Sequence, residues 1–170
     1  MVKYKIQEKN PIIALTGNEI DVLIHNVTCQ GVLAVGVAKQ IGITFPFVDT
    51  VNWKACREKA KNKRALLGMF SKAMTVANNR KYGVVNLYGQ IEPGPFFDKI
   101  KAKEALKKAL QDIGYQKKSG NPIRYGITLI GTEFNQLNES ESCQLINDAL
   151  EELYFNTDID YDVTIFKYET

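Results

Sequence analysis

The chain has 170 residues, of which 45% are hydrophobic and 24% charged, and its formal net charge is +3. This is the composition of an ordinary globular protein, and the length suits one domain, residues 1–170, with a substantial core. No apolar run approaches the roughly 20 residues of a membrane span, and the first residues lack the apolar centre of a signal peptide. We therefore expect a cytoplasmic protein with no membrane partner.

Cysteine and histidine are sparse. The three cysteines, Cys29, Cys56 and Cys143, are far apart, no C-x-x-C occurs, and His25 is the single histidine. This pattern argues against a zinc site or a disulfide framework. No metal and no cofactor are expected.

Lysine and arginine cluster in two runs, Lys54–Arg64 and Lys99–Lys108. Both runs fall on predicted helices, and a solvated helix face is the favoured explanation. A net charge of +3 tolerates a phosphate-bearing ligand but does not by itself argue for nucleic acid. Nucleic acid is therefore not the expected partner.

The first two segments of the chain are predicted to be strands. Val2–Gln7 alternates polar and apolar residues, and Asn10-Pro11 interrupts the pattern. Ile12–Leu15 is a short apolar run that ends in the turn-like Thr16-Gly17-Asn18. These features predict two strands that could pair as a hairpin at the edge of a sheet.

The next segment combines a strand, a glycine-bearing loop and a helix start. Asp21–His25 contains a buried apolar run, Cys29–Gly36 is the loop, and the helix begins at Val37. Such a loop offers backbone N–H groups to an anion, and the helix N-terminus adds partial positive charge. The spacing matches neither standard nucleotide-binding fingerprint. A turn that needs glycine only for its geometry remains the alternative.

Strands and helices alternate through the rest of the chain. The pattern predicts a helix at Phe47–Lys61, strands at Gly68–Val76 and Tyr82–Tyr88, a loop at Gly89–Pro95, a helix at Asp98–Ile113, a strand at Tyr125–Ile130, a helix at Glu139–Tyr154 and a strand at Asp162–Tyr168. The inward face of the helix at Asp98–Ile113 is predicted to hold Ile100, Ala102, Leu106, Ala109, Leu110 and Ile113.

This alternation predicts an α/β fold, with a mixed sheet covered by helices on both sides. In such folds ligands bind where strand ends lead into loops. Three segments fit that description: Thr28–Gly36, Gly89–Pro95 and Gly131–Asn138. We expect these loops to bound a binding cleft.

Several segments in the same order resemble the macro domain family. They are Asp21-Val-Leu-Ile-His, Cys29-Gln-Gly-Val, Gly36-Val-Ala-Lys-Gln-Ile, Phe45-Pro46, Leu67-Gly68, Asn86-Leu-Tyr-Gly-Gln90 and Val163-Thr-Ile-Phe. The resemblance is closest to the branch of phage and microbial ADP-ribose-1″-phosphate phosphatases and small deacylases of ADP-ribosylated proteins. It implies a three-layer α/β/α sandwich with a mixed, mostly parallel sheet. It also implies an ADP-ribose-type small molecule, or an ADP-ribosylated protein, as the partner.

The resemblance further implies where the ligand is held. The pyrophosphate would lie between the loop at Cys29–Gly36 and the loop that starts at Gly131. Tyr88 and Phe134 could stack on a base or cover a ribose, although aromatic residues at strand ends are more often core. The residues implied to bind ligand are Thr28, Cys29, Gln30, Gly31, Val32, Leu33, Gly36, Val37, Tyr88, Gly131, Thr132, Glu133, Phe134 and Asn135.

The second loop departs from the family pattern, in which it is rich in glycine. Here only Gly131 remains, and Glu133 brings a carboxylate to where a phosphate would lie. Like charges a few ångströms apart cost about 1 to 4 kcal/mol, depending on solvent. The acidic residue of related hydrolases falls on Asn135 or Asn138, and an amide is no general base. Thr28 stands where the family often has asparagine.

Two residues could supply chemistry at this site, and each has a plainer explanation. His25 is a candidate general acid or base, but a hydrogen-bonded residue at a strand end is favoured. Cys29 could be a nucleophile, yet no basic neighbour is evident that would form its thiolate. A small buried loop residue is favoured there. Glu133 is the other weak catalytic candidate.

Three functions follow from these observations. The first is a module that binds ADP-ribose or a related NAD-derived nucleotide, with weak or no hydrolysis. The second is an ADP-ribose-1″-phosphate phosphatase or ADP-ribosyl hydrolase, in which His25 or Glu133 replaces the missing acid. The third is a basic nucleic-acid or protein interaction module. It ranks last because the basic residues have little aromatic interleaving.

Overall fold

The computed structural model describes residues 4–168 and shows a six-stranded sheet in the order β1-β6-β5-β2-β4-β3. The strands are β1 (Tyr4–Glu8), β2 (Val22–Thr28), β3 (Phe70–Ala77), β4 (Arg80–Gln90), β5 (Arg124–Thr128) and β6 (Asp162–Lys167). Each neighbouring pair is parallel except β3 and β4, which form an antiparallel hairpin. The predicted mixed, mostly parallel sheet is confirmed.

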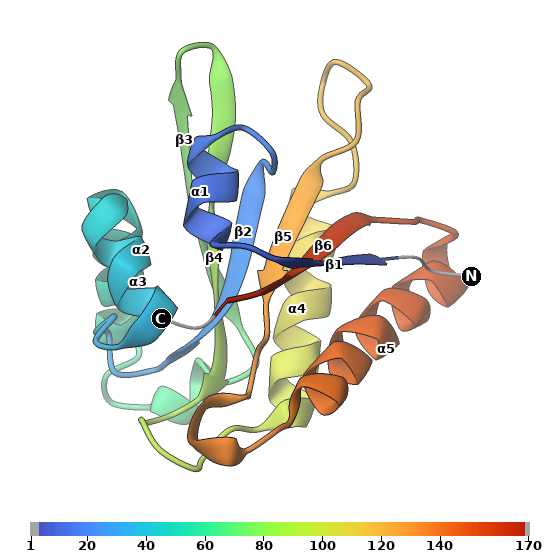
Figure 1. Ribbon diagram of the computed structural model, residues 1–170. Helices are drawn as coiled ribbons and strands as arrows, with labels where there is room; N and C mark the ends of the chain where they lie inside the picture. The colour runs from blue at the N-terminus through green and yellow to red at the C-terminus, as the bar shows by residue number, and fades with distance from the viewer. Residues whose placement is uncertain (1–3, 169–170) are drawn as a thin grey trace.

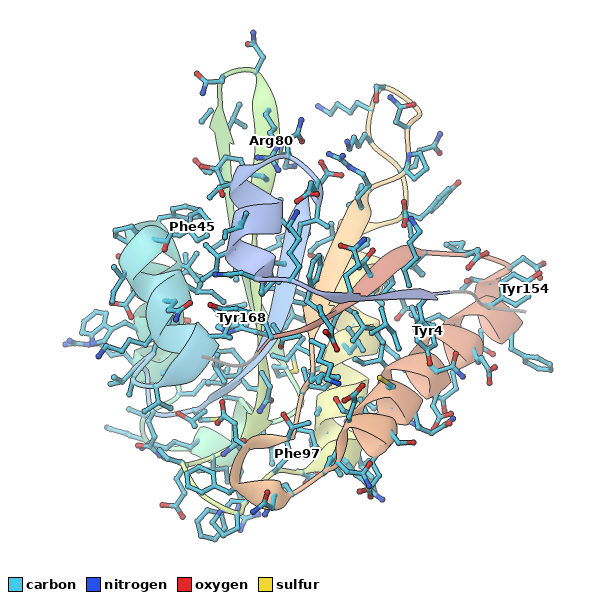
Figure 2. The ribbon with its side chains drawn as sticks, in the orientation of Figure 1. Tyr4, Phe45, Arg80, Phe97, Tyr154 and Tyr168 are labelled. Atoms are coloured by element: carbon cyan, nitrogen blue, oxygen red, sulfur yellow. The ribbon has the colours of Figure 1, made fainter. Side chains whose placement is uncertain are left out.

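Helices cover both faces of this sheet (Figure 1). They are α1 (Pro11–Thr16), α2 (Gly36–Thr44), α3 (Pro46–Glu58), α4 (Lys99–Ile113) and α5 (Glu139–Thr157), with short 3₁₀ turns η1 (Lys63–Ala65) and η2 (Glu133–Asn135). One core cluster joins α4 and α5 to the sheet, and a second joins α1, α2 and α3 to its other face. Side chains fill the space between the layers (Figure 2). The expected α/β/α sandwich is therefore correct.

The prediction of a second strand at Ile12–Leu15 is wrong, because this segment is helix α1. Asn10 caps that helix, its Oδ1 accepting the Ile12 N–H at 2.9 Å, and Pro11 occupies the first helical position. Proline favours this position because its fixed φ suits a helix and it lacks the N–H that would go unpaired there. The expected hairpin is also absent. β1 instead pairs in parallel with β6, and Val2 and Lys3 lie outside the described residues.

Helix α4 follows its predicted span closely. Asp98 caps it by accepting the Lys101 N–H at 3.0 Å, and Gly114 ends it with a φ of +92°. The predicted inward position of Ile100 is wrong, since 64% of that side chain is exposed. Ala105 is buried on the inner face, which the prediction omitted.

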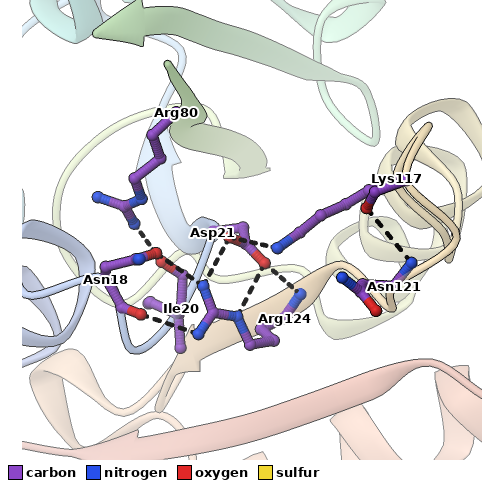
Figure 3. Close-up of polar contacts among 8 residues, drawn as sticks. Asn18, Ile20, Asp21, Arg80, Lys117, Asn121 and Arg124 are labelled. Carbon is purple, nitrogen blue, oxygen red and sulfur yellow. Dashed lines mark hydrogen bonds and ion pairs between the residues drawn. The ribbon is translucent and has the colours of Figure 1, made fainter. Parts of the chain in front are cut away.

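A buried charge cluster joins the amino ends of β2 and β5, away from the loops predicted to bind ligand (Figure 3). Asp21 is 4% exposed. Its carboxylate accepts hydrogen bonds from Arg124 Nε at 3.1 Å and Nη2 at 2.9 Å, and Lys117 Nζ lies 3.1 Å away. Burial would raise the pKa of Asp21, but the hydrogen bonds from Arg124 and Lys117 hold it below its ordinary value. This cluster fixes two neighbouring strands and the turn before β2.

No helix within residues 4–168 is long and apolar enough to cross a membrane.

Candidate functional site

A cavity of about 760 Å³ opens at the carboxyl ends of β2, β5 and β6. Parallel strands place their carboxyl ends along one edge of a sheet, where loops can surround a ligand. The walls come from the N-terminus of α2, the loop after β5 and the end of β6, with α1 contributing one residue. The lining residues are Pro11, His25, Asn26, Val35, Gly36, Val37, Ala38, Gln90, Thr128, Leu129, Ile130, Gly131, Thr132, Glu133, Phe134, Glu139, Phe166, Lys167 and Tyr168.

The first wall is the start of helix α2. Val35 occupies the N-cap position, and its side chain forms no capping hydrogen bond. The first N–H groups of a helix have no acceptor within the helix, and they carry its partial positive charge. Gly36, Val37 and Ala38 all line the cavity. This wall can therefore bind an anion through its backbone.

The second wall is the loop between β5 and α5. Its backbone is anchored at two points, by Ser142 Oγ donating to the Ile130 carbonyl at 2.7 Å and by Leu137 N donating to the Gly131 carbonyl at 2.9 Å. Phe134 and Asn135 both have left-handed backbone, with φ of 55° and 54°, which is uncommon for residues other than glycine. This conformation leaves Phe134 59% exposed at the cavity.

Asn138 has a structural role at the end of this loop. Its side chain accepts the Glu141 N–H at 2.8 Å, and Glu141 Oε1 accepts the Asn138 N–H at 3.1 Å. This capping box starts α5. Asn138, which the family resemblance implied as one of two positions for an acidic residue, serves here as a helix cap.

Gly131 combines a positive φ with a close approach, so we expect Gly131→Ala to destabilise the protein by about 2 to 3 kcal/mol. Its φ is +78°, and a Cβ there would lie 2.5 Å from the ring of Phe97, which Figure 2 places near this loop. Gly120→Ala is the matched control, because its φ is +93° and the added methyl would meet only Gln116 Nε2, at an ordinary 3.6 Å. That variant should lose only about 1 kcal/mol in urea denaturation. Equal losses would show that the Phe97 contact has no effect.

Three charged side chains line the cavity, and they are not equivalent. Lys167 pairs with Glu139 at 2.8 Å and with Glu8 at 3.6 Å. Within residues 4–168, Glu133 has no cationic nitrogen within 4 Å. Partial desolvation raises the pKa of its carboxyl, although the residue is exposed. The unbalanced charge of the cavity is therefore the Glu133 carboxylate.

A chain of hydrogen bonds runs from the cavity into the layer of α3. His25 Nε2 lies 2.6 Å from Asn86 Oδ1, and Asn86 Nδ2 donates to Ser71 Oγ at 3.1 Å. Ser71 Oγ lies 2.8 Å from the Tyr88 hydroxyl, which donates to Asn52 Oδ1 at 2.9 Å. Because Asn86 Oδ1 can only accept, the His25 Nε2 must carry a proton. Burial lowers the pKa of His25 to about 4. The residue is thus a neutral, hydrogen-bonded strand residue.

The first half of the loop at Cys29–Gly36 does not face the cavity. Cys29 is fully buried, and burial raises the pKa of its thiol to about 12, so it holds no thiolate at neutral pH. Gln30 donates to the Ile91 carbonyl at 2.9 Å and accepts from Lys63 Nζ at 2.6 Å. Gly31 lies against α3, where a Cβ would be 3.3 Å from that of Cys56. This half of the loop packs against protein.

The structure therefore divides the residues predicted to bind ligand. The cavity lining includes Gly36, Val37, Gly131, Thr132, Glu133 and Phe134. It does not include Thr28, Cys29, Gln30, Gly31, Val32, Leu33, Tyr88 or Asn135. The predicted stacking by Tyr88 is wrong, because its ring is fully buried and its hydroxyl belongs to the hydrogen-bond chain from His25.

Sequence reasoning missed Asn26 and the far end of the cavity, whereas Gln90 lies in Gly89–Pro95, one of the segments expected to bound the cleft. Asn26 Nδ2 donates to Gln90 Oε1 at 3.1 Å, and both side chains line the cavity. Phe166, Lys167 and Tyr168 line it from the end of β6. Ligands gather at the carboxyl ends of parallel strands. That rule predicts a role for Phe166, Lys167 and Tyr168 only once β6 is known to lie beside β5.

No group of three or more His, Cys, Asp or Glu side chains within the described part of the chain could hold a metal ion.

The arrangement of layers and strands is that of the macrodomain fold. The macrodomain of Mycobacterium tuberculosis DarG superposes with a TM-score of 0.72 and 17% identity, covering 96% of this chain and 98% of that one. The macrodomain of Thermus aquaticus DarG gives 0.67 and 20%, covering 99% of both chains. Thermosipho africanus DarTG in complex with ADP-ribose gives 0.61 and 17%, covering 86% of this chain and 38% of that one. No protein-family model and no curated protein sequence matches the chain.

Proposed function

We propose that this protein binds ADP-ribose or a related NAD-derived nucleotide in the cavity at the strand ends, with weak or no hydrolysis. The observation that carries the proposal is the uncapped N-terminus of α2, which faces the loop at Gly131 across the cavity of a macrodomain fold. A helix N-terminus binds phosphate through its backbone N–H groups. One structure with the same fold, T. africanus DarTG, holds ADP-ribose.

The dimensions and chemistry of the cavity agree with such a ligand. Its volume of about 760 Å³ lies within the range of about 300 to 1,000 Å³ for small-molecule sites. Tyr168, which is 36% exposed at the end of β6, offers an aromatic surface that suits a base. Asn26, which is half-buried on the floor, offers an amide that suits ribose hydroxyls. The start of α2 suits the phosphates.

Titration calorimetry with ADP-ribose, ADP-ribose-1″-phosphate and cyclic ADP-ribose variants tests this proposal. We expect at least one ligand to bind with a Kd in the micromolar range. Absence of heat with all of them, at protein concentrations well above micromolar, would refute it.

Removing the unbalanced carboxylate should strengthen binding of an anionic ligand. We expect Glu133→Gln to bind ADP-ribose about fivefold more tightly, since Glu133 is exposed and a like-charge contact at about 4 Å costs about 1 kcal/mol in bulk water. The pKa of Glu133 is raised in the free protein, so affinity should increase as pH falls through that value, and the variant should lose this dependence. Glu151→Gln is the matched control, because it removes the same charge from an exposed residue of α5 that does not line the cavity. It should change affinity less than twofold at neutral pH. Unchanged affinity in Glu133→Gln would contradict the proposed position of the phosphates.

Glu133 also favours a second candidate, hydrolysis of ADP-ribose-1″-phosphate or of ADP-ribosyl groups. A carboxyl in a cavity with a raised pKa is suited to general acid–base catalysis. His25 is less suited, because its Nε2 proton is held by Asn86. Incubation with ADP-ribose-1″-phosphate and with ADP-ribosylated protein tests this candidate. Turnover that disappears in Glu133→Gln supports it, and absence of turnover removes it.

A further inference from the structure

The two lysine-rich runs differ in their ion pairing. In the second run, Lys101 lies 3.6 Å from Glu104, and Lys103 and Lys107 both contact Glu152, at 3.1 and 3.7 Å. The first run, on α3 and η1, contains six cations: Lys54, Arg57, Lys59, Lys61, Lys63 and Arg64. Within residues 4–168, none of these six has a carboxylate within 4 Å. A solvated helix face with internal ion pairs therefore explains the second run, but the first run has no such pairs.

Positive charge is concentrated in the segment 53–64. Its one acidic residue, Glu58, leaves a net charge of +5 in twelve residues, whereas the whole chain carries +3. The rest of the molecule is therefore slightly acidic. All six cations except Lys63 are exposed. This surface attracts a polyanion more strongly than the net charge suggests.

An aromatic side chain lies within this basic surface. Trp53, the single tryptophan, is 48% exposed, and the Arg57 guanidinium lies 4.8 Å from its ring centroid. Lysines alone would suit any polyanion. An exposed indole with an arginine over it adds a platform on which an unpaired base can stack. The basic residues have little aromatic interleaving along the chain as a whole, but in this segment an exposed tryptophan lies beside them.

We propose that residues 53–64 form a binding surface for a single-stranded nucleic acid, in which Lys54, Arg57 and Lys61 contact phosphates and Trp53 stacks on a base. This surface is separate from the nucleotide cavity, because none of residues 53–64 lines that cavity. Charge complementarity selects the phosphodiester backbone, and the tryptophan selects strands whose bases are unpaired. The proposal does not depend on what the cavity binds.

Fluorescence anisotropy with labelled 20-nucleotide oligothymidylate and oligouridylate, between 50 and 300 mM KCl, tests this surface. We expect binding that weakens with salt and quenches Trp53. Each phosphate contact to a single strand contributes about 0.7 to the slope of log K against log salt. The triple variant Lys54→Gln, Arg57→Gln, Lys61→Gln should therefore flatten that slope by about 2 and weaken binding at least tenfold at 100 mM. A difference in Kd between the two oligonucleotides would show that the surface distinguishes a DNA strand from an RNA strand.

A second triple variant, Lys101→Gln, Lys103→Gln, Lys107→Gln, removes the same charge from α4 and should change affinity less than twofold. Trp53→Ala should weaken strand binding about tenfold, consistent with base stacking, and leave duplex binding unchanged. Both triples should retain the ADP-ribose affinity of the parent protein, which separates this proposal from the proposed nucleotide site. Equal losses in the two triples, effective competition by polyglutamate, or no binding at 50 mM KCl would each overturn it.

Discussion

Asp21→Ala is expected to lower the free energy of unfolding by about 3 kcal/mol. Removing one partner of a buried ion pair leaves an uncompensated charge, which costs about 3 to 5 kcal/mol. The lower end applies because the side chains of Arg124 and Lys117 are 34% and 36% exposed, so water can partly replace the carboxylate. The Arg124 backbone N–H, which donates to Asp21 at 2.8 Å, also loses its acceptor. Urea denaturation at pH 7 measures the loss.

A second ion pair on the same fold gives the matched control. Asp112 pairs with Lys72 at 2.7 Å, but the two side chains are 43% and 48% exposed. Exposed pairs contribute about 0 to 1 kcal/mol, so Asp112→Ala should be nearly neutral. The native pKa of Asp21 is depressed, and its contribution is therefore present above the unfolded value of 3.8 and lost as pH falls through the native value. Equal losses in the two variants at pH 7 would contradict the assigned role of Asp21.

Asp21 also illustrates what the sequence can and cannot disclose. The apolar run after it, Val22–Ile24, predicts a buried strand, and the structure confirms one. The partners of its carboxylate are about a hundred residues away, on β5 and the loop before it. Strand existence depends on local pattern, whereas the charge pairing depends on which strands become neighbours. Only the former can be predicted from this segment alone.

Helix α1 shows how local capping outweighs an apolar pattern. Ile12–Leu15 is too short for its periodicity to distinguish a strand from a helix. Asn10-Pro11 was interpreted as a strand break, but the same two residues are a helix N-cap and first position. The assignment of Ile12–Leu15 also decides the edge of the sheet. Because this segment is a helix, β1 has no hairpin partner in it and pairs with β6 instead. Asn10-Pro11 is thus a helix-start signal as well as a strand-break signal, and the two residues alone do not distinguish these roles.

The candidate site was predictable in part for the same reason. Gly36 begins the helix that follows β2, Gly131 lies in the loop directly after β5, and both line the cavity. Tyr88 also lies near a strand end, but the alternation of side chains along β4 places its ring in the core under α3. A loop can be found from glycines, but the face toward which a strand residue points depends on register. Phe166–Tyr168 needed the order of strands as well.

The hydrogen-bond chain that begins at His25 leads to the second large effect, a loss of about 3 kcal/mol of stability between pH 6.5 and pH 4. Burial lowers the native pKa of His25 from 6.5 to about 4. In this range the unfolded chain binds a proton that the folded chain does not, so stability falls as pH falls. A shift of 2.5 units at about 1.4 kcal/mol per unit sets the size. Below pH 4 this contribution is constant, and the loss from Asp21 begins.

His25→Gln separates the titration from the hydrogen bond. A glutamine amide can donate to Asn86 Oδ1 as the ring does, but it does not ionise. The variant should therefore keep its free energy of unfolding nearly constant between pH 6.5 and 4.5, where the parent loses stability. Because His25 is the single histidine, its imidazole signals in an NMR titration of the untagged chain are unambiguous, and they should not move between pH 8 and 5. A midpoint near 6.5 would mean that the ring is solvated. Asn86 Oδ1 would then not accept the Nε2 proton of His25. The order of donors and acceptors in the hydrogen bonds from His25 to Asn52 would no longer be fixed.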